Sequence, residues 1–158
     1  MSFGLAVVLE PVGLHRKGEI ELSDVLAFLS KHPSYHEAGA IASFVGVVRE
    51  DPAHESKAKV THLEYEAYHE VALKRLQEIR DRIKKQDGVI EVSIHHVIDR
   101  LNVGEPSLFV AILGRHRQHV FPALSETVEL VKREVPIWKK EFTGEGSHWV
   151  STEKAHEH

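Results

Sequence analysis

Cysteine is absent from the 158-residue sequence. This absence excludes disulfide bonds, thiolate metal ligands and cysteine nucleophiles, so any sulfur chemistry would have to use sulfur supplied by another molecule. The sequence also lacks an apolar run near the roughly 20 residues needed to cross a bilayer, and its first residues lack the basic and small-residue features of a signal peptide. We therefore expect a soluble, cytoplasmic protein with no membrane partner.

An excess of basic residues is also missing, since 20 Lys and Arg face 24 Asp and Glu and the formal net charge is -4. A nucleic-acid partner is therefore not expected. Glycine-rich phosphate loops and a GxSxG nucleophile elbow are absent as well. The 13 histidines form no HExxH or Cys/His pattern, and the adjacent His95 and His96 would point to opposite faces of a strand. We expect neither a metal nor another cofactor.

The apolar pattern predicts a single α+β domain over residues 1–150 and a frayed, disordered tail at 151–158. Helices are interspersed irregularly with neighbouring strands, which favours a mostly antiparallel sheet over a doubly wound parallel one. Strands are predicted at residues 5–11, 39–49 (buried), 59–68, 89–98 and 107–113, with a polar mobile loop at 50–58. Three helices are predicted: one after an N-cap at Ser23, one ending at Gln86, and one with Pro122 in its first turn that ends at Pro136.

Each predicted helix has an apolar stripe with helical spacing. The stripes are Val25, Leu26 and Leu29; Ala72, Leu76, Ile79 and Ile83; and Phe121, Leu124, Val128, Val131 and Val135. At about 100° per residue, Lys132 lies roughly 60° from the centre of the third stripe, whereas Arg133 lies about 160° away. A lysine at such a boundary can be partly desolvated, which would lower its pKa and make its amine a candidate nucleophile or proton donor. The alternative is that Lys132 only snorkels past the apolar stripe.

The segment IWKKEF follows the proline that ends the third helix, and we expect it to be extended. Its side chains would then alternate, with Trp138, Lys140 and Phe142 on one side and Ile137, Lys139 and Glu141 on the other. Either lysine could face a pocket beside Lys132, where two ammonium groups would lower each other's pKa and an anionic substrate would relieve the repulsion. The alternative is a solvated edge strand that lysines protect against aggregation.

Several basic residues lie at the junction between a strand and the third helix, in the segment GRHRQH. Arginine side chains and a helix N-terminus together make a favourable site for phosphate or carboxylate. Loop arginines are also often only solvated. Arg49, at the end of the strand predicted at 39–49, is by the same reasoning either a ligand clamp or a capping charge.

Six blocks of the sequence, in order and spacing, resemble the catalytic (large) subunit family of molybdopterin synthase from about residue 3 to residue 150. These blocks are GAIASFVGVVRED, LEYEAY, IHHVIDRLNVGEPSLFVAI, RHRQHVFPA, LVKREVPIWKKEF and GEGSHWV. The resemblance implies an α/β hammerhead-type fold and a homodimer that binds two small ubiquitin-like sulfur carriers as a heterotetramer. It implies conversion of cyclic pyranopterin monophosphate (precursor Z) to molybdopterin, with sulfur delivered as a thiocarboxylate on the carrier's C-terminal Gly-Gly tail.

The resemblance also implies roles for individual residues. It marks Lys132 and Lys139 as catalytic lysines that bind substrate. His116 and Arg117 resemble a pterin-phosphate clamp that can act across the dimer interface. The remaining substrate-binding positions that it marks are Lys140 and Glu141 beside the lysines, Val47, Val48 and Arg49 at the end of the FVGVVR strand, and Phe44 as a pocket wall.

Arg115 departs from the family pattern, because a small residue usually precedes the HR pair. An extra cation there would either tighten phosphate binding or point to solvent. Two other functions stay open from the sequence: a non-catalytic module that docks the tail of a ubiquitin-like carrier, and a phosphate-binding structural subunit whose lysines only bind anions. The presence of both Lys132 and Lys139 favours the enzyme over the docking module.

Overall fold

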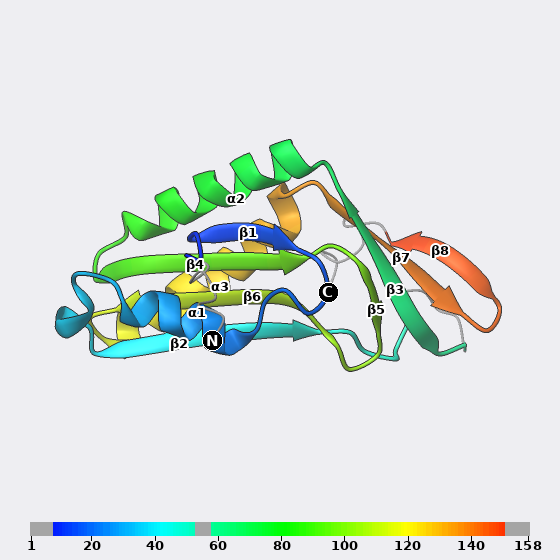
Figure 1. The fold of residues 1–158 in the computed structure, drawn as a ribbon, viewed down its shortest axis with the longest axis horizontal. Coiled ribbons are helices and arrows are strands. Elements are labelled where there is room, and N and C mark those ends of the chain that lie inside the picture. Colours follow the sequence, from blue (N-terminus) through cyan, green and yellow to red (C-terminus); the bar gives the residue numbers. More distant parts are fainter. Residues whose placement is uncertain (1–7, 53–57, 151–158) are drawn as a thin grey trace, which may run out of the picture.

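The computed structural model describes residues 8–52 and 58–150. Two four-stranded sheets form its framework, with three α-helices packed on the first sheet (Figure 1). The elements in chain order are β1 (Val12–His15), α1 (Leu22–Ser30), the 3-10 turn η1 (Tyr35–Glu37), β2 (Ala40–Val47), β3 (Val60–Ala67), α2 (His69–Lys84), β4 (Val89–Val97), β5 (Arg100–Asn102), β6 (Pro106–Gly114), α3 (Arg117–Glu134), β7 (Ile137–Thr143) and β8 (Gly146–Val150).

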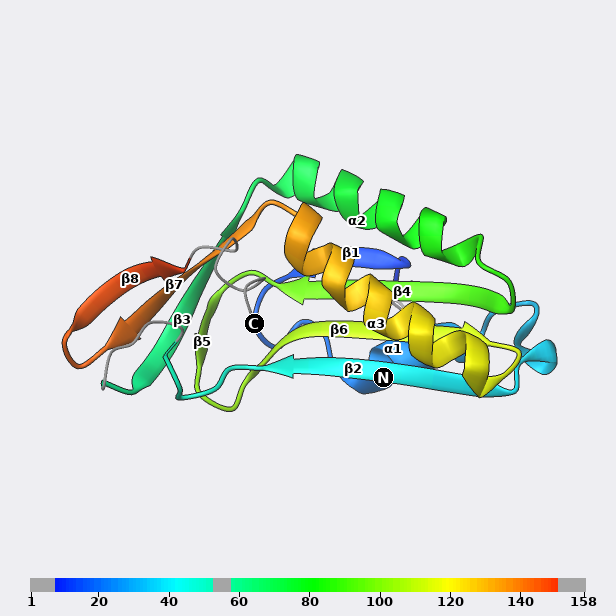
Figure 2. The ribbon, with the colours of Figure 1, turned by 180° about the vertical axis from the view of Figure 1, so that it is seen from behind.

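The first sheet has the strand order β1-β4-β6-β2 and the second has the order β5-β3-β7-β8. Among the described strands only β1 and β4 pair in parallel, and the other pairs are antiparallel. Helix α1 covers one face of the first sheet while α2 and α3 cover the other, and the second sheet lies at one end of the first (Figure 2). The α+β class, the mostly antiparallel pairing and the three helices are therefore confirmed.

The stripe predicted for α2 is confirmed, because all four of its residues are buried against the first sheet. The strands β4 and β6 lie at the centre of that sheet and pair antiparallel, as the short DRLNVGEP link between the two predicted strands indicates. Alternate residues of β6 enter two separate cores: Val110 and Ile112 pack with α2 and α3, whereas Phe109 and Leu113 pack with α1. The central strands thus anchor all three helices and fix where α3 ends.

The predicted start of α1 is wrong by two residues. The N-cap is Glu21 rather than Ser23, and the Asp24 carboxylate accepts a hydrogen bond from the Glu21 backbone N–H at 2.9 Å. An acidic side chain at the third helical position satisfies a free N–H at the helix start, so the cap does not need Ser23. Val25 and Leu29 are buried as predicted, but Leu26 is exposed.

The first strand is also displaced from its predicted position. Residues 5–7 lie outside the described residues, and residues 8–11 are not in a strand. The strand forms at Val12–His15 instead, where Gly13 pairs with His95 of β4. A Cβ at Gly13 would lie 2.7 Å from Nε2 of His15, so a side chain at this position would force the His15 ring to move.

The strand predicted at 39–49 forms, but it is not buried. β2 is an edge strand of the first sheet, and its side chains are mostly half-exposed because no strand pairs with its outer side in the described chain. Val47 is 53% exposed. The loop predicted at 50–58 lies largely outside the described residues, as does the tail predicted at 151–158.

The third helix begins five residues earlier than Pro122 would suggest. It starts at Arg117 with His116 as an N-cap whose side chain makes no capping hydrogen bond, and Pro122 lies inside it. No Ser, Thr, Asp or Asn stands at this helix start, so no capping residue marks it in the sequence. Phe121 is 63% exposed and was wrongly placed in the buried stripe. Val128, Val131 and Val135 are buried as predicted.

Two strands were missed by the sequence patterns. The link between β4 and β6 contains β5, which pairs with β3 of the second sheet. After IWKKEF, the segment GSHWV turns back as β8 and pairs with β7, with Gly146 in a positive-φ conformation (φ 134°) at the turn. In the described part of the chain, no helix is both long enough and apolar enough to span a membrane.

Candidate active site

The last turn of α3 brings Lys132 to the end of the first sheet. Its side chain is exposed, and its ammonium lies 5.8 Å from the centroid of the Phe44 ring in β2. This is cation–π distance, so the ring can stabilise the ammonium. The lysine that periodicity placed at the rim of the stripe and the phenylalanine that resemblance placed in the wall therefore lie together.

Lys139 lies on the inner face of the second sheet, directly opposite Tyr65 in the pairing of β3 with β7. Burial lowers the pKa of Lys139, and the positive charges of Lys132 and Arg49 lower it further, while the Glu141 carboxylate acts in the opposite direction. A second lysine close to Lys132 was predicted from the alternation of IWKKEF. The structure brings the two ammonium groups, Arg49 and Glu141 into one cluster.

Lys140 lies on the other face of β7. Its ammonium is 5.5 Å from the Phe142 ring centroid and 5.5 Å from that of Trp149 in β8. This grouping confirms the alternation predicted for the extended segment. Lys140 therefore points away from the cluster, and among the two adjacent lysines only Lys139 faces Lys132.

The end of β2 holds Arg49 at the same edge. The Val48 N–H donates to the Glu105 carbonyl at 3.0 Å, and the Gly104 N–H donates to the Val48 carbonyl at 2.8 Å. Val48 is buried between these contacts, whereas Val47 is largely exposed. These two hydrogen bonds fix the backbone at Val48 and so the direction in which Arg49 follows it. Arg49 lies close enough to Lys139 for its charge to lower the pKa of that lysine.

His116 and Arg117 lie at the opposite end of α3. Fifteen residues separate Arg117 from Lys132, which corresponds to roughly 22 Å along a helix. One chain therefore does not bring the HR pair to the lysines. Arg115, the departure from the family pattern, forms an ion pair with Glu37 at 3.1 Å and also lies at that distant end.

The sequence patterns missed His96 and Tyr65 as neighbours of Lys139. His96 lies at the end of β4, with its ring in edge contact with Tyr65 at a centroid distance of 5.1 Å. Burial, together with the charge of Lys139, lowers the pKa of His96 to about 4. Burial also raises the pKa of Tyr65, and the Ser107 side chain acts in the opposite direction. The alternation of LEYEAY placed Tyr65 on an inward face, but no local pattern could show that two sheets would meet there.

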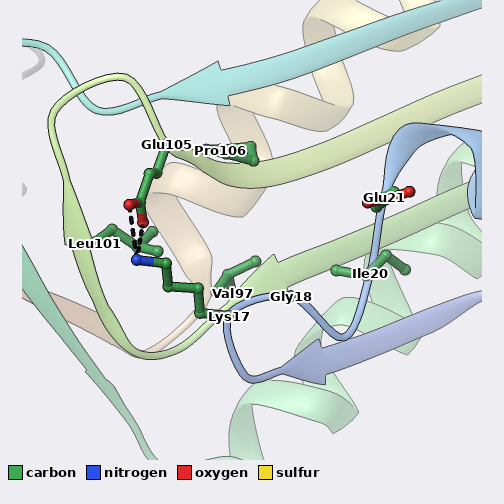
Figure 3. A pocket seen from close by; sticks show the side chains of 8 residues that line it. All are labelled: Lys17, Gly18, Ile20, Glu21, Val97, Leu101, Glu105 and Pro106. Atoms are coloured by element: carbon green, nitrogen blue, oxygen red, sulfur yellow. Dashed lines mark hydrogen bonds and ion pairs between the residues drawn. The ribbon is translucent and has the colours of Figure 1, made fainter.

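A separate pocket of about 330 Å³ lies between the β1–α1 link and the segment that leads into β6 (Figure 3). The cation in its lining, Lys17, forms a 2.7 Å ion pair with Glu105. Ile20, Val97 and Leu101 form much of the remaining lining. Because its cation is already neutralised, this pocket offers less to an anionic ligand than the lysine cluster does.

The cluster can bind an anion and stabilise negative charge. Arg49, Lys132 and Lys139 supply three cations, and Glu141 supplies one buried carboxylate. A partly buried ammonium that is crowded by other cations gains free energy when an anion binds, and it can also donate a proton more readily than a solvated lysine. Such groups stabilise the developing charge of a tetrahedral adduct without having to reorganise.

Comparisons with known sequences identify the relatives of this chain. A profile of the family described as MoaE protein matches residues 15–134. The chain is 33% identical over 144 residues to the molybdopterin synthase catalytic subunit of Pyrococcus abyssi, across 90% of this chain and 93% of that relative. It is 35% identical over 131 residues to molybdopterin synthase catalytic subunit 1 of Mycobacterium tuberculosis, across 83% of this chain and 84% of that one.

Solved structures show the same fold. Molybdopterin synthase from Staphylococcus aureus superimposes with a TM-score of 0.78 at 30% identity, across 90% of this chain and 98% of that chain. A chain from the complex of subunits 1 and 2 of the molybdopterin-converting factor of Helicobacter pylori has a similar fold, with a TM-score of 0.71 at 18% identity, across 90% of this chain and 91% of that chain. By sequence and fold, this chain belongs to the MoaE family, the family of molybdopterin synthase catalytic subunits.

Proposed function

We propose that this chain is a sulfurtransferase that converts precursor Z to molybdopterin in molybdenum cofactor biosynthesis. The observation that carries the proposal is the cluster in which the half-buried Lys139 lies near Lys132 and Arg49. A cluster of this kind suits an anionic substrate and a reaction that builds up negative charge. The chain has no cysteine, so the sulfur comes from a partner molecule.

The proposed sulfur donor is the C-terminal thiocarboxylate of a small ubiquitin-like carrier with a Gly-Gly tail. The Helicobacter pylori structure is named as a complex of two subunits of the molybdopterin-converting factor, and this supports a small partner for a chain of the same fold. Lys132 and Lys139 would stabilise the tetrahedral adduct of the thiocarboxylate or transfer protons as oxygen leaves. Arg49 and Glu141 would hold the substrate and the lysines in place.

The proposed assembly is a homodimer with one carrier on each subunit, located in the cytoplasm, with residues 1–150 as the single catalytic-subunit domain. The position of His116 and Arg117 supports a dimer. Roughly 22 Å of helix separates this pair from Lys132, so a phosphate clamp made by the pair would serve the site of the other subunit. In a dimer with a two-fold axis, each subunit can contribute residues to the site of the other.

The function is tested by mixing the protein with thiocarboxylated carrier and precursor Z and measuring molybdopterin. Product is expected only when the carrier bears the thiocarboxylate, and a carrier with an ordinary carboxylate is the matched control. If the protein binds the carrier but no product forms, the chain is a docking module without catalysis. If it binds phosphate but not the carrier, it is a phosphate-binding structural subunit.

The shared site is tested by subunit complementation. Lys132→Ala and Arg117→Ala proteins should each have little activity, but a mixture that exchanges subunits should recover about one quarter of wild-type turnover, because half of the dimers then contain one intact site. Mixing Lys132→Ala with Lys139→Met should recover nothing, because both lysines belong to the same subunit's site. If the first mixture also stays inactive while subunit exchange is demonstrated, the HR pair does not act across the interface.

A further inference from the structure

His96 is a buried titratable residue beside the lysine cluster, and neither the motifs nor the proposed reaction gives it a role. It is 8% exposed, and its Nδ1 lies 2.9 Å from the Val97 carbonyl oxygen. A carbonyl oxygen can only accept a hydrogen bond, so Nδ1 carries the proton. In the neutral ring this leaves Nε2 with a free lone pair.

The ring is neutral under ordinary conditions. Burial, helped by the charge of the nearby Lys139 ammonium, lowers the pKa of His96 to about 4. At neutral pH His96 is therefore a hydrogen-bond acceptor through Nε2 and not a cation. A group with so low a pKa is a poor base at pH 7, so it can orient an ammonium but not deprotonate it. Within the described residues, Nε2 of His96 has no hydrogen-bond partner.

The charged groups around Lys139 are mostly cations, which cannot accept a hydrogen bond from its ammonium. Lys132 approaches from α3 and Arg49 from the end of β2, and both are cations that repel the Lys139 ammonium. Glu141, from the same strand, is the anion of the group. Tyr65 lies opposite Lys139 across the strand pair and also contacts the His96 ring, so it links the two residues. An ammonium has three N–H donors, so a hydrogen bond from Lys139 to Glu141 would leave donors for another acceptor.

We propose that His96 is a positioning residue for Lys139: its Nε2 accepts a hydrogen bond from a water that the Lys139 ammonium also binds, and this bridge holds the ammonium toward the substrate. The interaction itself follows from the placement of His96, Tyr65 and Lys139, whereas its effect on turnover rests on the proposed function. An acceptor stabilises the charged form of the lysine, so it opposes the lowering of the pKa that burial and the neighbouring cations cause.

Two substitutions separate the roles of the two ring nitrogens. In His96→Asn the side-chain amide can still donate to the Val97 carbonyl, but no acceptor remains at the position of Nε2. In His96→Gln the side-chain oxygen can reach that position. We expect the Asn variant to lower the pKa of Lys139 by about one unit and kcat by about tenfold, with KM for precursor Z little changed, because a hydrogen bond to a charged group is lost. The Gln variant should stay within about twofold of wild type.

The pKa of Lys139 can be measured without substrate, from the pH dependence of its acetylation by acetic anhydride, read by mass spectrometry. If the Asn and Gln variants both titrate like wild type, the inference is overturned, whether or not the wild type makes molybdopterin. An equal change in the pKa of Lys139 in both variants also overturns the inference, because the loss of the buried ring, and not the loss of an acceptor, would then explain the change. If the Asn variant shifts but the wild type makes no product, the positioning interaction stands and the proposed function fails.

A measurement on the wild-type protein covers the case in which the variants do not fold. The ¹⁵N chemical shifts of the His96 ring report which nitrogen is protonated. We expect a protonated Nδ1 and an unprotonated Nε2 at pH 7, with the Nε2 shift changing as Lys139 titrates. A proton on Nε2 at pH 7, or an Nε2 shift that ignores the titration of Lys139, would rule out the acceptor role.

Discussion

Replacing Lys139 with methionine is expected to lower turnover by about 10²- to 10³-fold, the loss seen when one preorganised donor is removed from a charge-stabilising site. Lys139 faces the inside of the second sheet, where burial and the charges of Lys132 and Arg49 lower its pKa. Methionine keeps much of the apolar length of the lysine side chain, so the protein should still fold. The loss should therefore appear in kcat of the purified variant with thiocarboxylated carrier and precursor Z.

The adjacent lysine provides the matched control. Lys140 lies on the opposite face of β7, between the Phe142 and Trp149 rings. Lys140→Met makes the same chemical change one residue away, and turnover should stay within about threefold of wild type because a partly exposed cation–π contact contributes little. Equal losses in the two variants would mean that the face of the strand does not determine which lysine acts.

Lys132→Ala should reduce turnover as strongly as Lys139→Met while the protein stays folded, because the Lys132 side chain is exposed and takes no part in the core. Its removal also has a measurable effect on its neighbour. Without the Lys132 charge, the pKa of Lys139 should rise, and the basic limb of the pH profile of any remaining activity should move to higher pH. Unchanged turnover in Lys132→Ala would contradict the proposed role of this residue.

The two lysines could be predicted from the sequence because each lies in a regular element with a strong period. Val128, Val131 and Val135 define the buried side of α3, and this places Lys132 at its rim whether the helix begins at Arg117 or near Pro122. The alternation of β7 separates Lys139 from Lys140 in the same way. Errors at the ends of these elements do not change which face a central residue occupies.

The rest of the site depends on contacts between distant segments. His96 lies near enough to Lys139 for the lysine charge to lower its pKa only because the end of β4 lies beside the second sheet, and no local period in the sequence shows this proximity. The edge position of β2 was missed for the same reason, since a strand's own composition does not say how many neighbours it will have. Arg49 was marked by the family resemblance, while the residues alone left it between a ligand clamp and a capping charge.

The helix ends show a different kind of limit. The start of α1 is satisfied by Glu21 and Asp24 instead of Ser23, and the start of α3 by no standard cap. Capping preferences differ by about 1 kcal/mol, so the packing of the helix against the sheet readily overrides them. The same packing leaves Phe121 exposed, because the helix turns Val120 and Ala123 toward the core.

Removing one buried carboxylate at the far end of β4 should cost much more stability than removing a helix cap. Glu91 is 4% exposed, and its Oε1 accepts hydrogen bonds from Nε and Nη2 of Arg80 in α2 at 2.9 and 2.6 Å. Lys84 of α2 and His32, which follows α1, lie 3.5 Å from its other oxygen. This one side chain therefore ties both helix layers to the central strand.

Glu91→Ala is expected to lower the free energy of unfolding by about 3–5 kcal/mol, the usual loss when one partner of a buried ion pair is removed and the other charge stays buried. The Arg80 side chain is only 15% exposed and would lose its two bonds to Glu91. The change can be measured by urea unfolding: the urea concentration at the midpoint should fall, while the dependence of the unfolding free energy on urea concentration should stay the same. Turnover of the folded variant should persist, because five residues of strand, roughly 17 Å, separate Glu91 from His96.

An exposed ion pair on α2 is the control for this substitution. Arg75 and Glu78 lie 3.2 Å apart with about half of each side chain exposed, so Glu78→Ala should cost less than about 1 kcal/mol. The double variant Glu91→Leu with Arg80→Leu should recover much of the stability lost in Glu91→Ala, because neither charge is then left buried alone. If Glu91→Ala costs no more than Glu78→Ala, the buried carboxylate does not hold the helices to the sheet, and the apolar cores on the two faces of β4 are sufficient.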